Sequence, residues 1–173
     1  WVLQQACKMQ ASWLQQYPLI NTTVSVNVSS IQLHDRSFPK KLQRVLDHTG
    51  LNPQNLVLEL TETILLDDYV SDHRVLEEIS ALGVRIALDD FGTGYSSFSY
   101  LKNYPIDHVK IDRLFIDNLF SCEENKAITT SIIELSHRLG KTVVAEGVDS
   151  QEELDFLMMK GCDTYQGFLS SRA

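Results

Sequence analysis

The stretch Val84-Arg85-Ile86-Ala87-Leu88-Asp89-Asp90-Phe91-Gly92-Thr93-Gly94 joins an apolar run directly to two adjacent carboxylates and a glycine-containing loop. The apolar residues predict a buried strand that ends at Asp89 and Asp90. Two neighbouring aspartates repel each other and cost stability unless positive charge lies beside them. We expect a divalent metal to supply that charge, although a solvated acidic turn would explain the stretch if it stood alone.

The same pattern recurs, because five other short runs rich in β-branched residues carry a polar residue near their end. These runs are 24–29, 56–62, 108–112, 142–147 and 162–167. Their polar residues are, in chain order, Asn27, Glu59, Glu62, Lys110, Glu146 and Gln166. Between most runs lie segments of helical periodicity, so the chain alternates strand and helix. Such alternation predicts a parallel sheet with helices outside it.

The sequence predicts the apolar faces and the ends of individual helices. Apolar residues recur at three- and four-residue steps along the first helix and predict one apolar face there: Val2, Ala6, Met9, Trp13 and Tyr17. Similar patterns at Leu42–Leu46 and Val75–Leu82 predict two more helices, the second ending at Gly83. Capping boxes are predicted to open the last two helices, formed by Ser121 with Glu124 and by Ser150 with Glu153.

Polar residues at the carboxyl ends of parallel strands leave two architectures open, a (β/α)8 TIM barrel and an open doubly wound sheet. No G-x-G-x-x-G or G-K-[ST] sequence follows a strand, which favours the barrel. Such barrels typically need roughly 250 residues, whereas this chain has 173. We therefore expect residues 1–173 to form one domain that is incomplete at its N-terminus, with about six of the eight strands present.

Composition excludes several classes of protein. The chain is 43% hydrophobic, enough to bury a core. Its net charge of −8 disfavours a nucleic-acid surface. No apolar run approaches the roughly 20 residues that span a bilayer. The three cysteines are scattered, which suggests reduced thiols that lie mostly in the core, and the five histidines lack zinc-ligand spacing.

Taken in order, the polar motifs identify a family. The set comprises Val26–Ser29, Leu58–Glu62, Asp89–Tyr95, Val109–Asp112, Val144–Val148 and Gln166–Phe168. This set resembles the EAL domain of bacterial cyclic di-GMP phosphodiesterases, and the resemblance covers the whole chain. It implies a (β/α)8-type barrel whose Glu-Ala-Leu motif would precede Trp1.

The resemblance also implies a two-metal site. Asn27, Glu59 and Asp89 would bind one ion, and Asp89 would bridge to a second ion held by Asp90 with Glu146 nearby. Carboxylate and amide oxygens, without thiolate or imidazole, favour Mg²⁺ or Mn²⁺. Two such ions can activate a water and stabilise the leaving oxygen of a phosphodiester.

Further roles follow from the same resemblance. Lys110 would orient and help deprotonate the attacking water, assisted by Glu146, and the metal ions should lower the pKa of its ammonium group. Gln166 would position water or substrate, and Asp112 would contact substrate. Glu62 would steady the loop 91–97 rather than bind metal.

Each residue taken singly has a simpler interpretation. Asn27 could be a turn residue, Glu59 and Glu62 a solvated strand edge, and Lys110 a surface lysine. Glu146 and Gln166 precede glycines, so turn formation would explain them as well. Convergence at one edge of one sheet weakens all of these alternatives together.

Two functions remain open. The first is a metal-dependent hydrolysis of cyclic di-GMP to linear pGpG, with the isolated 173-residue chain weak or inactive because the family's first ligand would precede it. The second is a catalytically silent EAL-like module that binds the dinucleotide or a protein. Asp149 departs from the glutamate usual in the family, and this shorter carboxylate would weaken support of the site.

The resemblance carries expectations about the parent protein. We expect cyclic di-GMP as ligand, a homodimer, and a fused sensor or regulatory domain. Exposed edges at the strands of Asn27 and Gln166 would invite pairing with another chain. We expect a cytoplasmic location, in a parent that can be tethered to a membrane, and no nucleic-acid partner.

Overall fold

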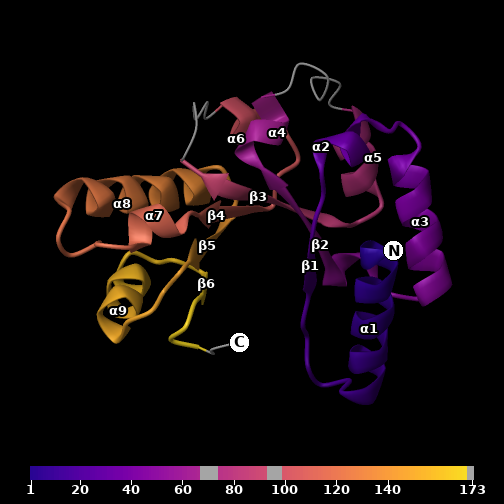
Figure 1. Cartoon of the computed structure of the whole chain (residues 1–173), viewed down its shortest axis with the longest axis horizontal. Coiled ribbons are helices and arrows are strands. Elements are labelled where there is room, and N and C mark those ends of the chain that lie inside the picture. Colours follow the sequence, from indigo (N-terminus) through magenta and orange to yellow (C-terminus); the bar gives the residue numbers. More distant parts are fainter. Residues whose placement is uncertain (67–73, 93–98, 171–173) are drawn as a thin grey trace. The chain divides into compact units, whose positions relative to one another are not determined.

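The computed structural model describes residues 1–66, 74–92 and 99–170 of the chain. The chain divides into two compact units, Trp1–Ala87 and Leu88–Ala173 (Figure 1). The described residues form six strands in the sheet order β1-β2-β3-β4-β5-β6. The order of the strands in the sheet is their order in the chain. Helices lie between successive strands along the sequence, as the sequence pattern predicts.

The first unit contains α1 (Val2–Gln16), β1 (Val24–Asn27), α2 (Ser30–His34), α3 (Phe38–Thr49), the 3-10 turn η1 (Pro53–Asn55), β2 (Leu56–Thr61), α4 (Glu62–Leu66) and α5 (Arg74–Ala81). β1 pairs with β2 in parallel, with Asn27 opposite Glu59. Helix α1 packs against β1 and α3, and α3 packs against α5. Leu56, Leu58 and Leu60 of β2 are almost completely buried and form the centre of this unit's core.

β3 (Arg85–Phe91) crosses the boundary between the units. The second unit continues with α6 (Ser99–Asn103), β4 (His108–Ile111), α7 (Arg113–Ile116), α8 (Glu123–Arg138), β5 (Thr142–Glu146), α9 (Gln151–Met159) and β6 (Thr164–Gln166). β4 pairs in parallel with β5, and β5 pairs in parallel with β6. Helices α7 and α8 cover these strands, so Val109, Ile111 and Val143 are shielded from solvent.

The apolar face predicted for α1 is largely exposed in the structure. Its residues Val2, Met9, Trp13 and Tyr17 are 62%, 53%, 51% and 51% exposed, whereas the buried residues are Cys7, Gln10 and Ala11. The small side chains of Cys7 and Ala11 allow α1 to approach β1 and α3 closely. The side-chain amide of Gln10 donates to the carbonyl and hydroxyl oxygens of Thr22 at 2.7 and 2.9 Å. The apolar repeat of α1 therefore marks a face that the described part of the chain does not cover.

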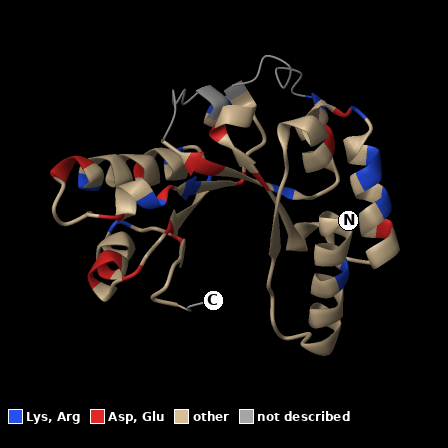
Figure 2. Ribbon diagram, viewed as in Figure 1, with Lys and Arg blue, Asp and Glu red and all other residues tan. Residues whose placement is uncertain are grey.

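The burial of the cysteines differs in part from expectation. All three thiols are free, as predicted, but only Cys7 is buried, while Cys122 and Cys162 are half-buried. Burial raises the pKa of Cys7 and of Cys162 to about 11. Figure 2 shows basic residues along α3 and acidic residues at the beginning of α9. None of the described helices combines the length and hydropathy that crossing a membrane demands.

One predicted helix cap is present and one is absent. Ser150 caps α9, accepting from the Glu153 amide at 3.3 Å, while the Glu153 carboxylate accepts from the Ser150 amide at 2.9 Å. The cap predicted at Ser121 is wrong, because α8 begins after Cys122 and the Ser121 hydroxyl donates to the Asn118 carbonyl.

Removal of the Ser150 cap should be measurable. Ser150→Ala leaves backbone donors of the first turn of α9 without their acceptor, so we expect the free energy of unfolding to fall by about 1 kcal/mol. Urea denaturation measures this change. The control is Ser131→Ala on the exposed side of α8, where the hydroxyl only donates back to the Ala127 carbonyl and its loss should cost little. Equal effects of the two substitutions would contradict the assignment.

Candidate metal centre

Two carboxylates stand at the end of β3, which carries Asp89 and Asp90 as the sequence predicts. The apolar residues before them, Ile86, Ala87 and Leu88, are buried, whereas both aspartates are half-buried. Asp90 has a positive φ of 55°, a conformation that aspartate tolerates better than most residues. The strand therefore carries both side chains near its carboxyl end, with the backbone in a left-handed conformation at Asp90.

Lys110 bridges two strands through its ammonium group. Its Nζ lies 2.9 Å from Asp89 Oδ1 and 2.7 Å from Glu146 Oε1, and its side chain is only 7% exposed. Glu146 Oε1 also accepts a hydrogen bond from Gln166 Nε2 at 2.5 Å. The ends of β3, β5 and β6 and the middle of β4 thus contribute one connected cluster of polar side chains.

The cluster has an excess of negative charge. Burial, then the charge of Asp89 and the hydrogen bond and charge of Asp112, raise the pKa of Asp90, and Lys110 only partly offsets them. Oxygen atoms of Asp89, Asp90 and Glu146 lie within 4.8 Å of one another. Converging carboxylate oxygens are the donors that hard divalent cations prefer. The residues present therefore fit a divalent metal ion.

Asp112 has a local structural task besides its contact with Asp90. It follows β4 as the N-cap of α7, and its carboxylate accepts from the Leu114 amide at 2.7 Å. This contact fixes the entrance of the short helix. Its predicted contact with substrate stays a prediction.

Three predicted site residues belong to the first unit. Asn27 is the last residue of β1, and the next amide, that of Val28, donates to the Glu59 carbonyl at 2.9 Å. Glu62 begins α4 and is only 2% exposed. Most of the loop that Glu62 was expected to steady, at residues 93–97, lies outside the described residues. Metal binding by Asn27 and Glu59 and the role of Glu62 therefore stay predictions.

Arg113, for which the sequence predicts no role, lies near Gln166 together with Asp149. Arg113, Gly147, Asp149, Gln166 and Phe168 line a hollow of about 340 Å³ at the carboxyl ends of β4, β5 and β6. Asp149 was noticed only as a departure from the family pattern. Arg113 directly follows Asp112, and that adjacency is the signal that could have identified it.

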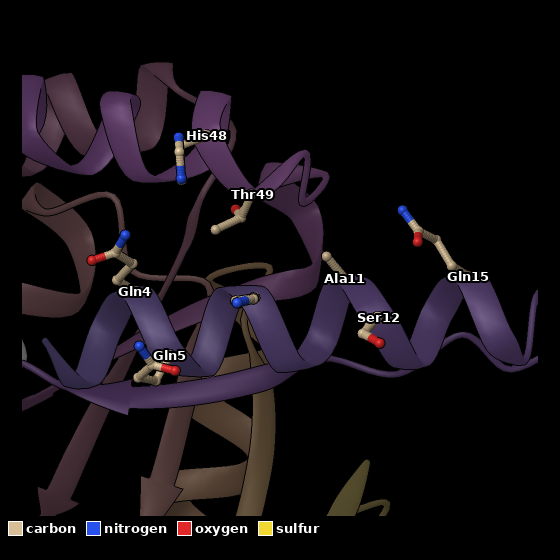
Figure 3. Close-up of a pocket in the computed structure, with 8 residues that line it drawn as sticks. Gln4, Gln5, Ala11, Ser12, Gln15, His48 and Thr49 are labelled. Atoms are coloured by element: carbon tan, nitrogen blue, oxygen red, sulfur yellow. The ribbon is translucent and has the colours of Figure 1, made fainter.

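A second hollow, of about 350 Å³, lies between α1 and α3 in the first unit. Figure 3 shows that its polar side chains do not converge, since Gln4 points towards His48 whereas Gln5 and Ser12 point away from α3. A ligand site needs a few polar groups aimed at the same point. This hollow therefore lacks the character of a functional site.

Comparison with known proteins identifies the family. The family model of the EAL domain matches residues 1–173, so the chain belongs to the EAL domain family. Similar proteins include the bifunctional diguanylate cyclase/cyclic di-GMP phosphodiesterase MucR of Pseudomonas aeruginosa, 38% identical over 172 residues, and the cyclic di-GMP phosphodiesterase PdeR of Escherichia coli, 34% identical over 172 residues. Both alignments cover 99% of this chain but only 25% and 26% of those proteins. The chain thus spans about a quarter of their length.

Solved structures agree with this assignment. The PaMucR phosphodiesterase in complex with c-di-GMP superimposes with a TM-score of 0.93 at 38% identity, over 99% of this chain and 69% of that chain. The EAL domain of Mycobacterium smegmatis DcpA gives a TM-score of 0.93 at 35% identity, over 99% and 77%. These likenesses confirm the predicted α/β, TIM-barrel-like EAL fold over the open doubly wound alternative.

Proposed function

We propose that this chain is the catalytic part of a metal-dependent phosphodiesterase that opens cyclic di-GMP to linear pGpG. The observation that carries the proposal is the cluster in which Lys110 lies between Asp89 and Glu146, at 2.9 and 2.7 Å, with Asp90 beside them. The names of similar proteins and the c-di-GMP complex of a similar structure support the choice of substrate. We propose that residues 1–173 belong to one EAL domain.

The three carboxylates of Asp89, Asp90 and Glu146 would hold divalent cations, which we propose to be Mg²⁺ or Mn²⁺, two in number. Asn27 and Glu59 are proposed as additional ligands on the strength of the family resemblance. Bound cations would lower the pKa of a water molecule and neutralise charge on the phosphodiester. The number of ions can be determined by titration with Mn²⁺.

The side chains of the cluster divide the remaining work. Lys110 would orient the attacking water and take its proton, and Glu146 would hold the ammonium group in place. Gln166, tied to Glu146, would position the water or the substrate, and Asp112 would contact the nucleotide. Attack of the water at one phosphorus would form a new P–O bond and break the P–O3′ bond. The O3′ oxygen would leave with the bonding electron pair and take up a proton from solvent, so the ring opens to a linear product with a 5′-phosphate and a free 3′-hydroxyl.

The experiment is incubation of cyclic di-GMP with the 173-residue chain and with the complete protein, in Mg²⁺ or Mn²⁺, followed by chromatography. The complete protein should produce pGpG, and a chelator should stop the reaction. We expect weak or no turnover from the 173-residue chain. Tight binding of intact cyclic di-GMP by the complete protein, without product, would instead favour a silent receptor module.

The organisation of the complete protein follows as a further part of this proposal. Because the chain spans about a quarter of its curated relatives, we propose an accompanying sensor or regulatory domain. We also propose a homodimer and a cytoplasmic location for the EAL domain. Light scattering of the complete protein measures the first of these two properties.

A further inference from the structure

We propose that Asp149, together with Arg113, is a positioning residue that holds Gln166 against Glu146, an inference that rests on the phosphodiesterase function proposed above. Asp149 lies in the loop between β5 and α9, three residues after Glu146. It belongs to the second unit, as do all of the residues that it contacts. Its carboxylate joins three segments that are separate in the sequence.

The contacts of Asp149 define this junction. Its Oδ1 accepts from the Phe168 amide at 3.0 Å, just beyond β6, and its Oδ2 accepts from Arg113 Nη2 at 3.2 Å, at the beginning of α7. Its own amide donates to Glu153 Oε2 at 2.9 Å, which ties the loop to the first turn of α9. The shorter carboxylate at this position therefore still reaches both the backbone after β6 and the guanidinium group.

Arg113 is held from a second side and lies across the backbone that follows Glu146. Its Nε donates to both carboxylate oxygens of Asp117 at 3.1 Å. A Cβ atom added to Gly147 would lie 2.4 Å from Arg113 Cγ, and Gly147 has a φ of +71°. The stem of Arg113 thus packs directly on Gly147, and only glycine fits there without strain.

The backbone after β6 lies equally close to the loop after β5. The Val148 amide donates to the Gln166 carbonyl at 3.1 Å, and the Leu169 amide donates to the Val148 carbonyl at 3.1 Å. A Cβ atom on Gly167 would lie 2.1 Å from the Val148 carbonyl oxygen. Any shift of the segment after β6 would therefore displace Gln166 relative to Glu146.

These contacts determine where two side chains of the proposed reaction centre meet. Gln166 Nε2 lies 2.5 Å from Glu146 Oε1, the same oxygen that Lys110 contacts. Outer residues that orient reactive side chains in this way commonly have large effects on activity without touching the reacting atoms. Arg113 and Asp149 are 51% and 34% exposed at the side chain, and ion pairs this exposed contribute little to global stability. Loss of the pair should consequently alter the site more than the fold.

The test uses amide resonances in the NMR spectrum of the full 173-residue chain, without metal or nucleotide. Asp149→Ala should shift or broaden the side-chain amide signals of Gln166, which are identified by their loss in Gln166→Ala. Asp149→Glu, which restores a carboxylate, should return them towards their original positions. Arg113→Gln is a second, exposed variant and should move the same signals. The matched control is Asp155→Ala on α9, an exposed residue whose carboxylate accepts from Gln151 Nε2 at 2.8 Å.

A kinetic comparison in the complete protein completes the test. Asp149→Ala should lower kcat for cyclic di-GMP with Mn²⁺ by about tenfold or more, with little change in KM. Unchanged Gln166 signals in Asp149→Ala, or moved signals with an unchanged kcat, would overturn the inference. Because the NMR comparison needs no turnover, it still decides the contact if the wild-type protein fails to hydrolyse cyclic di-GMP, an outcome that would contradict only the proposed function.

Discussion

Lys110→Met should reduce turnover of cyclic di-GMP by about 10²- to 10⁴-fold, the range expected when a group that transfers a proton is removed. Lys110 is 5% exposed and contacts Asp89 and Glu146 through its ammonium group. Methionine retains the length of the side chain but cannot orient water or accept a proton. The measurement is kcat at saturating substrate, together with the Kd for cyclic di-GMP in Ca²⁺, which should change little.

The control for this substitution is Lys126→Met. Lys126 lies on α8, where its Nζ contacts Glu123 Oε1 at 2.7 Å. Lys126→Met removes this ion pair on α8, so turnover should remain at the wild-type level. Wild-type turnover by Lys110→Met would remove Lys110 from the proposed mechanism.

Asp90→Asn should lower turnover by more than about a hundredfold, because even residues that only support a metal ligand cost about 10- to 100-fold. Asparagine keeps the shape of the side chain and tolerates the positive φ of 55° at this position. It removes one of three carboxylates that lie within 4.8 Å of one another. Affinity for Mn²⁺, measured by calorimetry, should fall together with turnover.

In the metal-free protein, the same substitution should increase the thermal stability. Burial and the neighbouring Asp89 raise the pKa of Asp90 in the folded state. Stability is therefore present while Asp90 is protonated and is lost as the pH rises above its unfolded pKa. Asp90→Asn abolishes this loss, so its Tm in a chelator should exceed that of the wild type at neutral pH.

Addition of Mn²⁺ tests whether Asp90 is a metal ligand. Wild-type Tm should rise on addition of Mn²⁺, because an ion that binds only the folded state stabilises it. The rise should be smaller for Asp90→Asn and unchanged for the exposed control Asp155→Asn. A full rise in Tm for Asp90→Asn would show that Asp90 is not a ligand.

The strands and their polar residues could be predicted because they depend on short-range patterns. An apolar run followed by carboxylates places Asp89 and Asp90 at the end of β3, and the same logic places Glu146 and Gln166 at the ends of β5 and β6. Alternation of strand and helix then puts these ends at one edge, as the fold requires. The roles of these residues in catalysis and metal binding stay predictions.

Features that depend on tertiary partners could not be predicted in this way. The repeat of apolar residues in α1 shows that a face exists but not which face packs, and the structure buries Cys7 and Gln10 instead. The pairing of Arg113 with Asp149 joins exposed residues 36 positions apart, which no periodicity reveals. The cap predicted at Ser121 is absent for a similar reason, because the Ser121 hydroxyl donates to the Asn118 carbonyl in the preceding turn.

The central claim is that Asp89, Asp90 and Glu146 hold the divalent ion beside Lys110. The most direct measurement is anomalous X-ray diffraction at the manganese edge from crystals of the complete protein grown with Mn²⁺. The account predicts an anomalous peak within coordination distance of carboxylate oxygens from Asp89 and Asp90, which disappears in Asp90→Asn. A protein that hydrolyses cyclic di-GMP while its manganese lies elsewhere, or is absent from this cluster, would contradict it.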